Sequence, residues 1–190
     1  EENSYQMSTI NDAILLRNRI IDLLEQAENE TDPILRKALL RIVIVGGGFA
    51  GVETAGELND FINDVSEYYP SISENDVKVT LIEATTEILN GFPQKLANFA
   101  KEKLVERGIN VILDAGVTSF DGKEVLLKSS SKSNKVLLSD SSQQKGHSRL
   151  VEINSISSRT LVWTAGVTPI DLVKESLFRT HKGRILVNEY

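Results

Sequence analysis

The sequence contains no cysteine and few histidines, and each shortage excludes a class of site. Without cysteine the chain can form no disulfide framework, no thiolate zinc site and no redox-active thiol. Its two histidines, His147 and His181, stand far apart in the sequence, so no metal centre is expected. No apolar run approaches the roughly 20 residues that a membrane-spanning helix needs. We therefore expect a soluble, intracellular chain without a metal.

Charge and length narrow the choice further. The formal net charge of −6 disfavours nucleic acid and anionic membrane as the main partners. With 190 residues and ordinary apolar and charged content, the chain can form one large or two small domains with a substantial core.

A hydrophobic run leads directly into a glycine-rich turn. Residues 42–45 are all apolar, which predicts a strand buried on both faces, as in a parallel sheet. Gly46, Gly48 and Gly51 then fit G-x-G-x-x-G, and residues 52–67 are predicted to be helical. In this pattern the first glycine allows the tight turn, the second lets a pyrophosphate approach the backbone, and the third lets the helix pack closely. The free N–H groups of the helix start would face the phosphates.

An acidic residue stands at the end of the next predicted strand. Residues 77–82 form that strand, and Glu83 follows it. A carboxylate at this place can accept the ribose hydroxyls of an adenosine and would repel a 2′-phosphate, so NADH is favoured over NADPH. Glu83 lies further from the glycines than the usual spacing of about 20 residues, because a long helix and the loop 68–76 intervene. The alternative is a solvated strand end, but the surrounding pattern favours dinucleotide binding.

A second carboxylate, Glu53, is predicted to lie in the first turn of the helix after the glycines. A carboxylate there interacts favourably with the helix dipole, which is a common structural role. The functional alternative is a polar group close to the reacting end of the nicotinamide. Both readings stay open.

Two predicted helices precede the glycine-rich turn. Residues 1–8 are polar and expected to be loose, and Thr9 with Asp12 forms a capping box that opens a helix to about residue 28. Asp32, followed by Pro33, opens a shorter helix through residue 40. A dinucleotide domain needs nothing before its first strand, so we expect residues 1–40 to lead in from another part of a larger protein.

The rest of the chain completes an α/β pattern. A helix at 93–106 and a strand at 109–113 give β-α-β-α-β, and right-handed crossovers then make a parallel sheet. Strands at 117–120, 124–127 and 150–156 predict an antiparallel meander, interrupted by a polar mobile loop at 129–148 in which residues 137–138 pair weakly. The remaining predicted elements are a sheet strand at 160–163, a turn at 164–169, a short helix at 171–177 and a strand at 185–187. The fold class is therefore α/β: a Rossmann-like FAD/NAD(P)-binding fold, with a central parallel sheet flanked by helices and an antiparallel three-stranded β-meander.

Several of these segments together resemble the type II NADH dehydrogenases, which are FAD-containing NADH:quinone oxidoreductases of the pyridine nucleotide-disulfide oxidoreductase superfamily. The resemblance covers nearly the whole chain in the right order. The segments that carry it are residues 46–53, 55–58, 80–84 and 161–167 with Pro169, together with the helical lead-in and residues 183–187. The excursion at 129–148 departs from the compact hairpin of the family.

The resemblance implies roles for particular residues. The glycine turn would cradle the pyrophosphate, Glu83 would hold the adenosine ribose, Glu53 would lie near the nicotinamide and flavin, and residues 164–166 would line the cleft. No catalytic side chain and no metal ligand are implied. The cofactor-binding residues implied are Gly46, Gly47, Gly48, Phe49, Ala50, Gly51, Glu53, Glu83, Ala84, Thr164, Ala165 and Gly166.

The resemblance also implies how the domain is used. In this family the NADH domain is inserted into a split FAD domain, so residues 41–183 would be the NADH-binding domain and 184–190 the start of the return. FAD would be bound mainly by segments absent here, so the chain alone would bind NADH without turnover. A hydride would pass from NADH to the flavin, and electrons then to a quinone. The alternatives are the same domain of a ferredoxin or rubredoxin reductase, or a non-catalytic NADH-sensing module.

The expected partners follow from the same comparison. They are NADH, a quinone through the full-length enzyme, a membrane surface through a missing C-terminal segment, and a second copy in a homodimer, with no nucleic acid. The implied location is cytoplasmic, at the inner face of the cell membrane.

Overall fold

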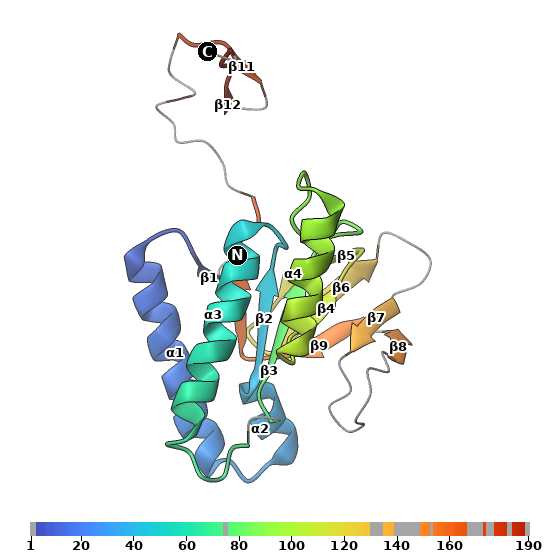
Figure 1. The fold of residues 1–190 in the computed structure, drawn as a ribbon. Helices are drawn as coiled ribbons and strands as arrows, with labels where there is room; N and C mark the ends of the chain where they lie inside the picture. Colours follow the sequence, from blue (N-terminus) through green and yellow to red (C-terminus); the bar gives the residue numbers. More distant parts are fainter. Residues whose placement is uncertain are drawn as a thin grey trace.

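A seven-stranded sheet forms the centre of the computed structural model, which describes residues 3–73, 76–129, 135–138, 149–152, 154–166, 173, 177–181 and 184–188 (Figure 1). The sheet runs in the order β1-β10-β2-β3-β4-β7-β8. The first five strands are parallel, and the last two are antiparallel to their neighbours. In sheet order, the strands are β1 (Tyr5–Gln6), β10 (Thr160–Trp163), β2 (Arg41–Val45), β3 (Lys78–Ile82), β4 (Asn110–Ile112), β7 (Lys135–Leu138) and β8 (Arg149–Glu152).

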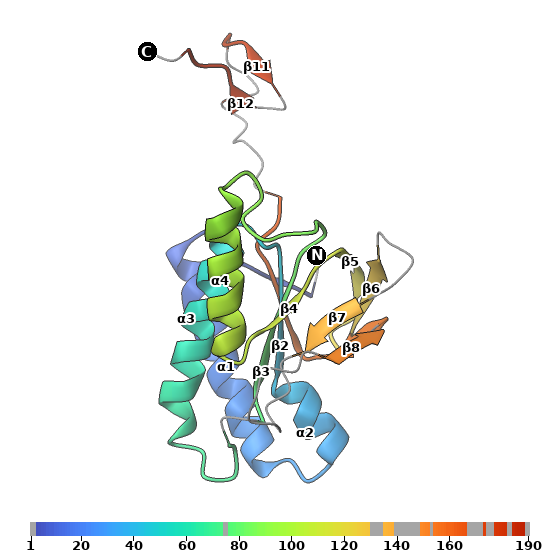
Figure 2. The same ribbon diagram turned by 45° about the vertical axis from the view of Figure 1, so that its right-hand side comes forward.

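The two faces of the sheet are buried by different layers. Successive residues of β2 point to opposite faces, so Ile42 and Ile44 join one apolar cluster while Val43 and Val45 join the other. Helices α1 (Ile10–Asn29), α3 (Phe49–Ser66) and α4 (Gln94–Glu106) bury the first face. The antiparallel sheet β5-β6-β9 buries the second, as Figure 2 shows. Its strands are β5 (Ala115–Phe120), β6 (Glu124–Ser129) and β9 (Ser155–Ser157). The predicted α/β fold with a meander is confirmed.

The predicted third strand of the meander was wrong in its extent. The structure places residues 149–152 and residues 155–157 in different sheets: β8 pairs with β7 at the edge of the main sheet, whereas β9 pairs with β6 in the meander. Residues 137–138, expected to pair weakly within the loop, belong to β7, which pairs instead with β4 and β8, both outside residues 129–148. Residues 130–134 and 139–148 of the predicted mobile loop lie outside the described residues.

The N-terminal residues are more ordered than predicted. Residues 1–8 were expected to be loose, but Tyr5 and Gln6 form β1, which pairs in parallel with β10. A two-residue strand has no periodicity of its own, so only its distant partner defines it. The helix α1 buries one side against the core through Leu16, Ile20, Leu23, Leu24 and Ala27. The segment before β2 is thus part of this core; whether residues 1–40 lead in from another domain stays a prediction.

The capping box of α1 is present as predicted, and it gives a testable stability effect. The Asp12 N–H donates to the Thr9 hydroxyl at 3.2 Å, and the Thr9 N–H donates to the Asp12 carboxylate at 2.8 Å. We expect Thr9→Ala to lower the free energy of unfolding by about 1 kcal/mol, because an orphan N–H loses its acceptor. Denaturant unfolding at pH 7 measures this, with Thr9→Ser as the control that keeps the hydroxyl.

The same cap should depend on pH. Hydrogen bonds lower the pKa of the Asp12 carboxyl: the largest effect comes from the Ser8 N–H, and Thr9 adds to it. The stabilising contribution of ionised Asp12 is therefore full above its unfolded pKa of about 3.9 and is lost as pH falls through the lower folded value. The difference in the free energy of unfolding between Asp12→Ala and the original chain should therefore shrink over that interval. A difference that stayed constant down to pH 2 would contradict a cap built on an ionised Asp12.

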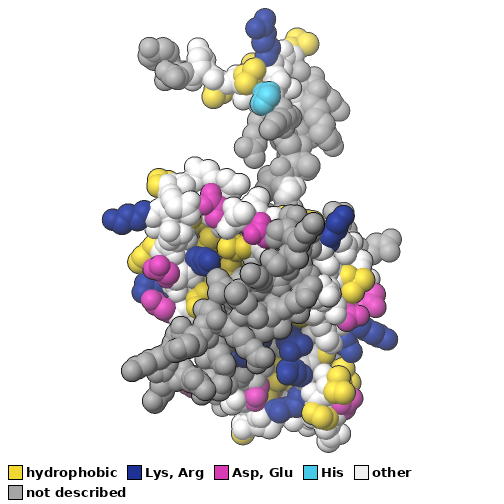
Figure 3. All heavy atoms as spheres, turned by 90° about the vertical axis from the view of Figure 1, so that its right-hand side faces the viewer, with side chains coloured by type: hydrophobic (Ala, Val, Ile, Leu, Met, Phe, Trp, Pro, Cys, Tyr) yellow, Lys and Arg dark blue, Asp and Glu magenta, His cyan; other side chains and the backbone are white. Residues whose placement is uncertain are grey.

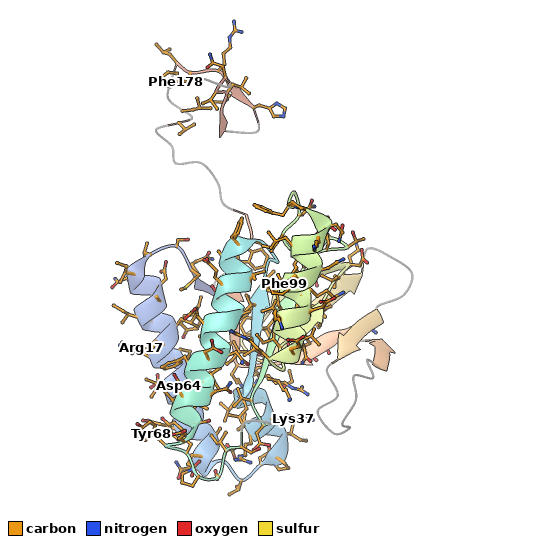
Figure 4. All side chains as sticks on the ribbon, viewed as in Figure 1. Arg17, Lys37, Asp64, Tyr68, Phe99 and Phe178 are labelled. Atoms are coloured by element: carbon orange, nitrogen blue, oxygen red, sulfur yellow. The ribbon has the colours of Figure 1, made fainter. Side chains whose placement is uncertain are left out.

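Shorter elements complete the described structure. The helix α2 (Pro33–Leu39) has Asp32 as its N-cap, as predicted. Strands β11 (Thr180–His181) and β12 (Arg184–Ile185) form a separate two-stranded antiparallel sheet, and β12 takes the place of the strand predicted at 185–187. Phe178, beside this hairpin in Figure 4, is exposed. Most of the helix predicted at 171–177, and residues 167–169 of the predicted turn, lie outside the described residues. Among the helices that are described, none combines the length and apolar character needed to span a bilayer.

Candidate dinucleotide site

The glycine turn joins the carboxyl end of β2 to the start of α3. Gly46 has φ of +110°, which explains a glycine at the exit from the strand. The helix begins at Phe49 rather than at the predicted residue 52, because Gly48 serves as its N-cap. No side chain caps this end of α3. Its first N–H groups therefore remain directed toward the space beyond the turn.

Gly51 and Gly48 differ sharply in their surroundings. A Cβ added at Gly51 would lie 1.7 Å from the Gly46 carbonyl oxygen and 2.8 Å from the Thr164 hydroxyl. Only glycine therefore lets α3 approach the turn this closely. A Cβ added at Gly48 would meet no protein atom within 4 Å. Gly48 is exposed, so the second glycine of the motif borders open space that a ligand can enter.

Glu83, directly after β3, is bonded to the glycine turn. The Gly47 N–H donates to Glu83 Oε2 at 2.5 Å, and the Thr85 N–H donates to Oε1 at 2.9 Å. A Cβ at Gly47 would come within 3.0 Å of the Glu83 side chain. The predicted carboxylate and the predicted turn are thus brought together. A carboxylate offers about four acceptor positions, so Glu83 keeps capacity for ligand hydroxyls.

The loop that follows Glu83 packs against the same turn. The Leu89 N–H donates to the Gly47 carbonyl oxygen at 2.7 Å. The rings of Phe49 and Phe92 meet edge to face, with centroids 4.7 Å apart. Both backbone groups of Gly47 are used by the protein, so a phosphate would have to be bound by the N–H groups that follow it.

Thr164 joins the end of β10 to the end of β2 by hydrogen bonds. Its hydroxyl donates to the Val45 carbonyl oxygen at 2.8 Å, and its N–H reaches the same oxygen at 2.9 Å. Ala165 lies against the glycine turn, since a Cβ at Gly46 would come 2.9 Å from its nitrogen. Gly166 is exposed and has φ of +78°. Two of the three residues predicted at the cleft, Thr164 and Ala165, therefore lie beside the turn.

For the other three predicted residues, Glu53, Ala84 and Ala50, the structure gives a position but no contact with the turn. Glu53 is exposed and is the fifth residue of α3, so the prediction that it lies in the first turn was wrong, because the helix starts at Phe49. Ala84 is exposed next to Glu83, and Ala50 follows Phe49 in the first turn of α3. The sequence analysis missed Thr85, whose contact with Glu83 depends on the turn of the chain after β3. A threonine two residues after the acidic strand end was the available signal.

The arrangement fits a dinucleotide on its own geometry. An uncapped helix start favours an anion, the open side of Gly48 leaves room for a pyrophosphate, and a half-buried carboxylate stands at the neighbouring strand end. All these groups gather at the carboxyl ends of parallel strands, where open α/β sheets bind ligands.

Comparison with known proteins agrees with this geometry. The chain is 33% identical over its whole length to the external alternative NADH-ubiquinone oxidoreductase of Yarrowia lipolytica mitochondria, and spans 31% of it. It is 32% identical over 96% of its length to the external alternative NAD(P)H-ubiquinone oxidoreductase B3 of Arabidopsis thaliana mitochondria, and spans 28% of that protein. The fold matches Plasmodium falciparum NDH2 in complex with NADH, with TM-score 0.75 and 27% identity, over 93% of this chain and 32% of that one.

The chain thus spans less than a third of the length of these relatives. The family described as pyridine nucleotide-disulphide oxidoreductase matches it across residues 7–190. Since the match extends over nearly the whole chain and includes both the glycine turn and the strand ends that form the site, the chain belongs to the pyridine nucleotide-disulphide oxidoreductase family.

Proposed function

We propose that this chain binds NADH as the dinucleotide-binding part of a flavin-dependent NADH:quinone oxidoreductase. The observation that carries the proposal is the open, uncapped start of α3 at Gly48, with Glu83 fixed on the same turn. The N–H groups after Gly47 would hold the pyrophosphate, and the Glu83 carboxylate would accept the ribose hydroxyls. The turn at Thr164 would border the cleft on its other side.

The chemistry would be supplied by the bound groups, NADH as hydride donor and a flavin as acceptor that passes electrons to a quinone. The sequence contains a single G-x-G-x-x-G, which the NADH site uses, so we propose that FAD is held mainly by protein outside these 190 residues. The residues described here would orient NADH and exclude water from it. No side chain among them is required to move a proton in hydride transfer.

Calorimetric titration of the chain with NADH, NADPH and FAD, each alone, tests the proposal. We expect NADH to bind most tightly, because Glu83 accepts ribose hydroxyls and repels a 2′-phosphate. We also expect no NADH oxidation without added flavin. Tighter binding of FAD than of NADH would assign the glycine turn to the flavin instead. Turnover by the chain without flavin would contradict the division of labour proposed above.

The relatives also bear on the acceptor. Those from Yarrowia lipolytica and Arabidopsis thaliana are named ubiquinone oxidoreductases, which favours a quinone over ferredoxin or rubredoxin as the acceptor of the whole protein. A non-catalytic NADH-sensing module is the remaining alternative, and a flavin site elsewhere in the same polypeptide would rule it out.

The proposed setting is a membrane surface. Both relatives are named mitochondrial, so their names favour a mitochondrial membrane over the cell membrane expected from the sequence. Membrane attachment and a homodimer remain predictions. Both acidic and basic side chains appear on the described part of the face in Figure 3. The prediction that nucleic acid is not a partner rests on the net charge of −6.

A further inference from the structure

We propose that Thr85 is a positioning residue that sets the preference for NADH over NADPH by holding the Glu83 carboxylate. The inference rests on the proposed function, because it concerns the ribose end of the same site. Thr85 was not among the residues predicted from the sequence, and it acts through Glu83 rather than on the ligand directly.

The contacts hold both oxygens of the carboxylate. Glu83 Oε2 accepts from the Gly47 N–H at 2.5 Å, and Oε1 accepts from the Thr85 N–H at 2.9 Å with the Thr85 hydroxyl oxygen at 3.0 Å. Thr85 is itself fixed, since the Asp114 N–H donates to its carbonyl oxygen at 3.0 Å. The Gly47 N–H reaches Oε2, so the position of Oε1 depends on Thr85, through its N–H and its hydroxyl together.

The Thr85 hydroxyl has two acceptors for its single proton. Its oxygen lies 3.0 Å from Glu83 Oε1 and 2.8 Å from the Glu87 carbonyl oxygen. A charged carboxylate is the stronger acceptor, so the proton points to Glu83, and the hydroxyl adds a third donor to the two backbone N–H groups.

A Glu83 carboxylate held in place also explains how the site would distinguish NADH from NADPH. The 2′-phosphate of NADPH offers acceptor oxygens and negative charge where NADH offers a hydroxyl, so a carboxylate held in place opposes it. A carboxylate released from Thr85 can rotate away from the phosphate. Loss of the Thr85 hydroxyl should therefore weaken NADH binding while leaving NADPH binding the same or improved.

The test compares Thr85→Val, which removes the hydroxyl and keeps the branched shape, with Thr85→Ser, which keeps the hydroxyl. The dissociation constants of NADH and NADPH are measured by calorimetry for each variant of the chain. We expect Thr85→Val to reduce the preference for NADH by about tenfold, the scale of one hydrogen bond to a charged group. Thr85→Ser should keep the preference to within about threefold. Thermal unfolding of each variant confirms that it is folded at the titration temperature.

A second pair of variants separates positioning from general loosening of the loop. In a Glu83→Gln background, Thr85→Val should change the preference by less than about twofold, because its effect passes through the carboxylate. Equal weakening of NADH and NADPH by Thr85→Val, or an undiminished effect in the Glu83→Gln background, would overturn the inference. A folded original chain that bound neither nucleotide would refute the proposed function, and this inference with it. A retained NADH preference with no change in Thr85→Val would refute the inference alone.

Discussion

Gly51→Ala is expected to abolish measurable NADH binding and to lower the free energy of unfolding by about 3 kcal/mol. The added methyl group would stand 1.7 Å from the Gly46 carbonyl oxygen, which is backbone and cannot rotate away. The start of α3 must then move off the turn, and the N–H groups that would meet the pyrophosphate move with it. Calorimetry with NADH and denaturant unfolding measure the two effects.

Two matched glycine substitutions serve as controls. Gly56→Ala, in the same helix, places its methyl 3.7 Å from the nearest atom, an Arg107 nitrogen, so it should raise stability by up to about 1 kcal/mol and leave binding intact. Gly48→Ala meets no protein atom within 4 Å, so it should lower stability by no more than about 1 kcal/mol, as expected for alanine at an N-cap. Yet it should weaken NADH binding, since the ligand would occupy that space. Normal binding by Gly51→Ala would refute the close-packing role of the third glycine.

Glu83→Ser is expected to shift the relative affinity from NADH toward NADPH by more than tenfold. The substitution removes the charge that repels a 2′-phosphate and both oxygens that would accept ribose hydroxyls. It also leaves the half-buried Gly47 N–H without its acceptor, at a cost of about 1–3 kcal/mol of stability. The ratio of the two dissociation constants is the decisive measurement, because it is insensitive to a general loss of affinity.

Glu83→Gln separates charge from geometry at this position. The amide keeps the length of the side chain and one acceptor oxygen, so the Gly47 N–H can remain bonded. If repulsion by the charge dominates the preference, Glu83→Gln should relax it nearly as far as Glu83→Ser does. If the ratio of the NADH and NADPH dissociation constants were unchanged in both variants, Glu83 would not select the nucleotide, even if it stabilises the turn.

The features predicted correctly from the sequence carry local signals. The strand at residues 42–45 is apolar at every position, and the capping box at Thr9 is a pattern of adjacent residues. The glycine turn was recognisable because its glycine spacing stands between a predicted apolar strand and a predicted helix. The start of α3 was misplaced because Gly48 caps it through its backbone, which no side-chain pattern reveals.

The features that were missed depend on contacts between distant residues. Tyr5 becomes part of a strand because Val162 lies beside it, and nothing in residues 1–8 signals that partner. The assignment of residues 149–152 and 155–157 to different sheets is set by their pairing with β7 and β6, and not by the local sequence. Thr85 is the exception, because it lies only two residues from Glu83, and a threonine at that spacing was an available local signal. The candidate site was therefore predictable in its glycines and its carboxylate, but not in the network that holds them.

The order of the strands has a consequence for how the chain is made. The central strand β2 lies between β3, which follows it closely, and β10, which is synthesised only after most of the chain has emerged. Until then one edge of β2 has unpaired backbone groups and exposed apolar side chains. Such an edge can pair with other polypeptides and lead to aggregation. The two neighbours of β10 in the sheet, β1 and β2, are synthesised early and can pair with it only after it has emerged. Closing such long loops slows folding, so a ribosome-bound chain that ends before residue 160 would depend on chaperones to stay free of aggregates.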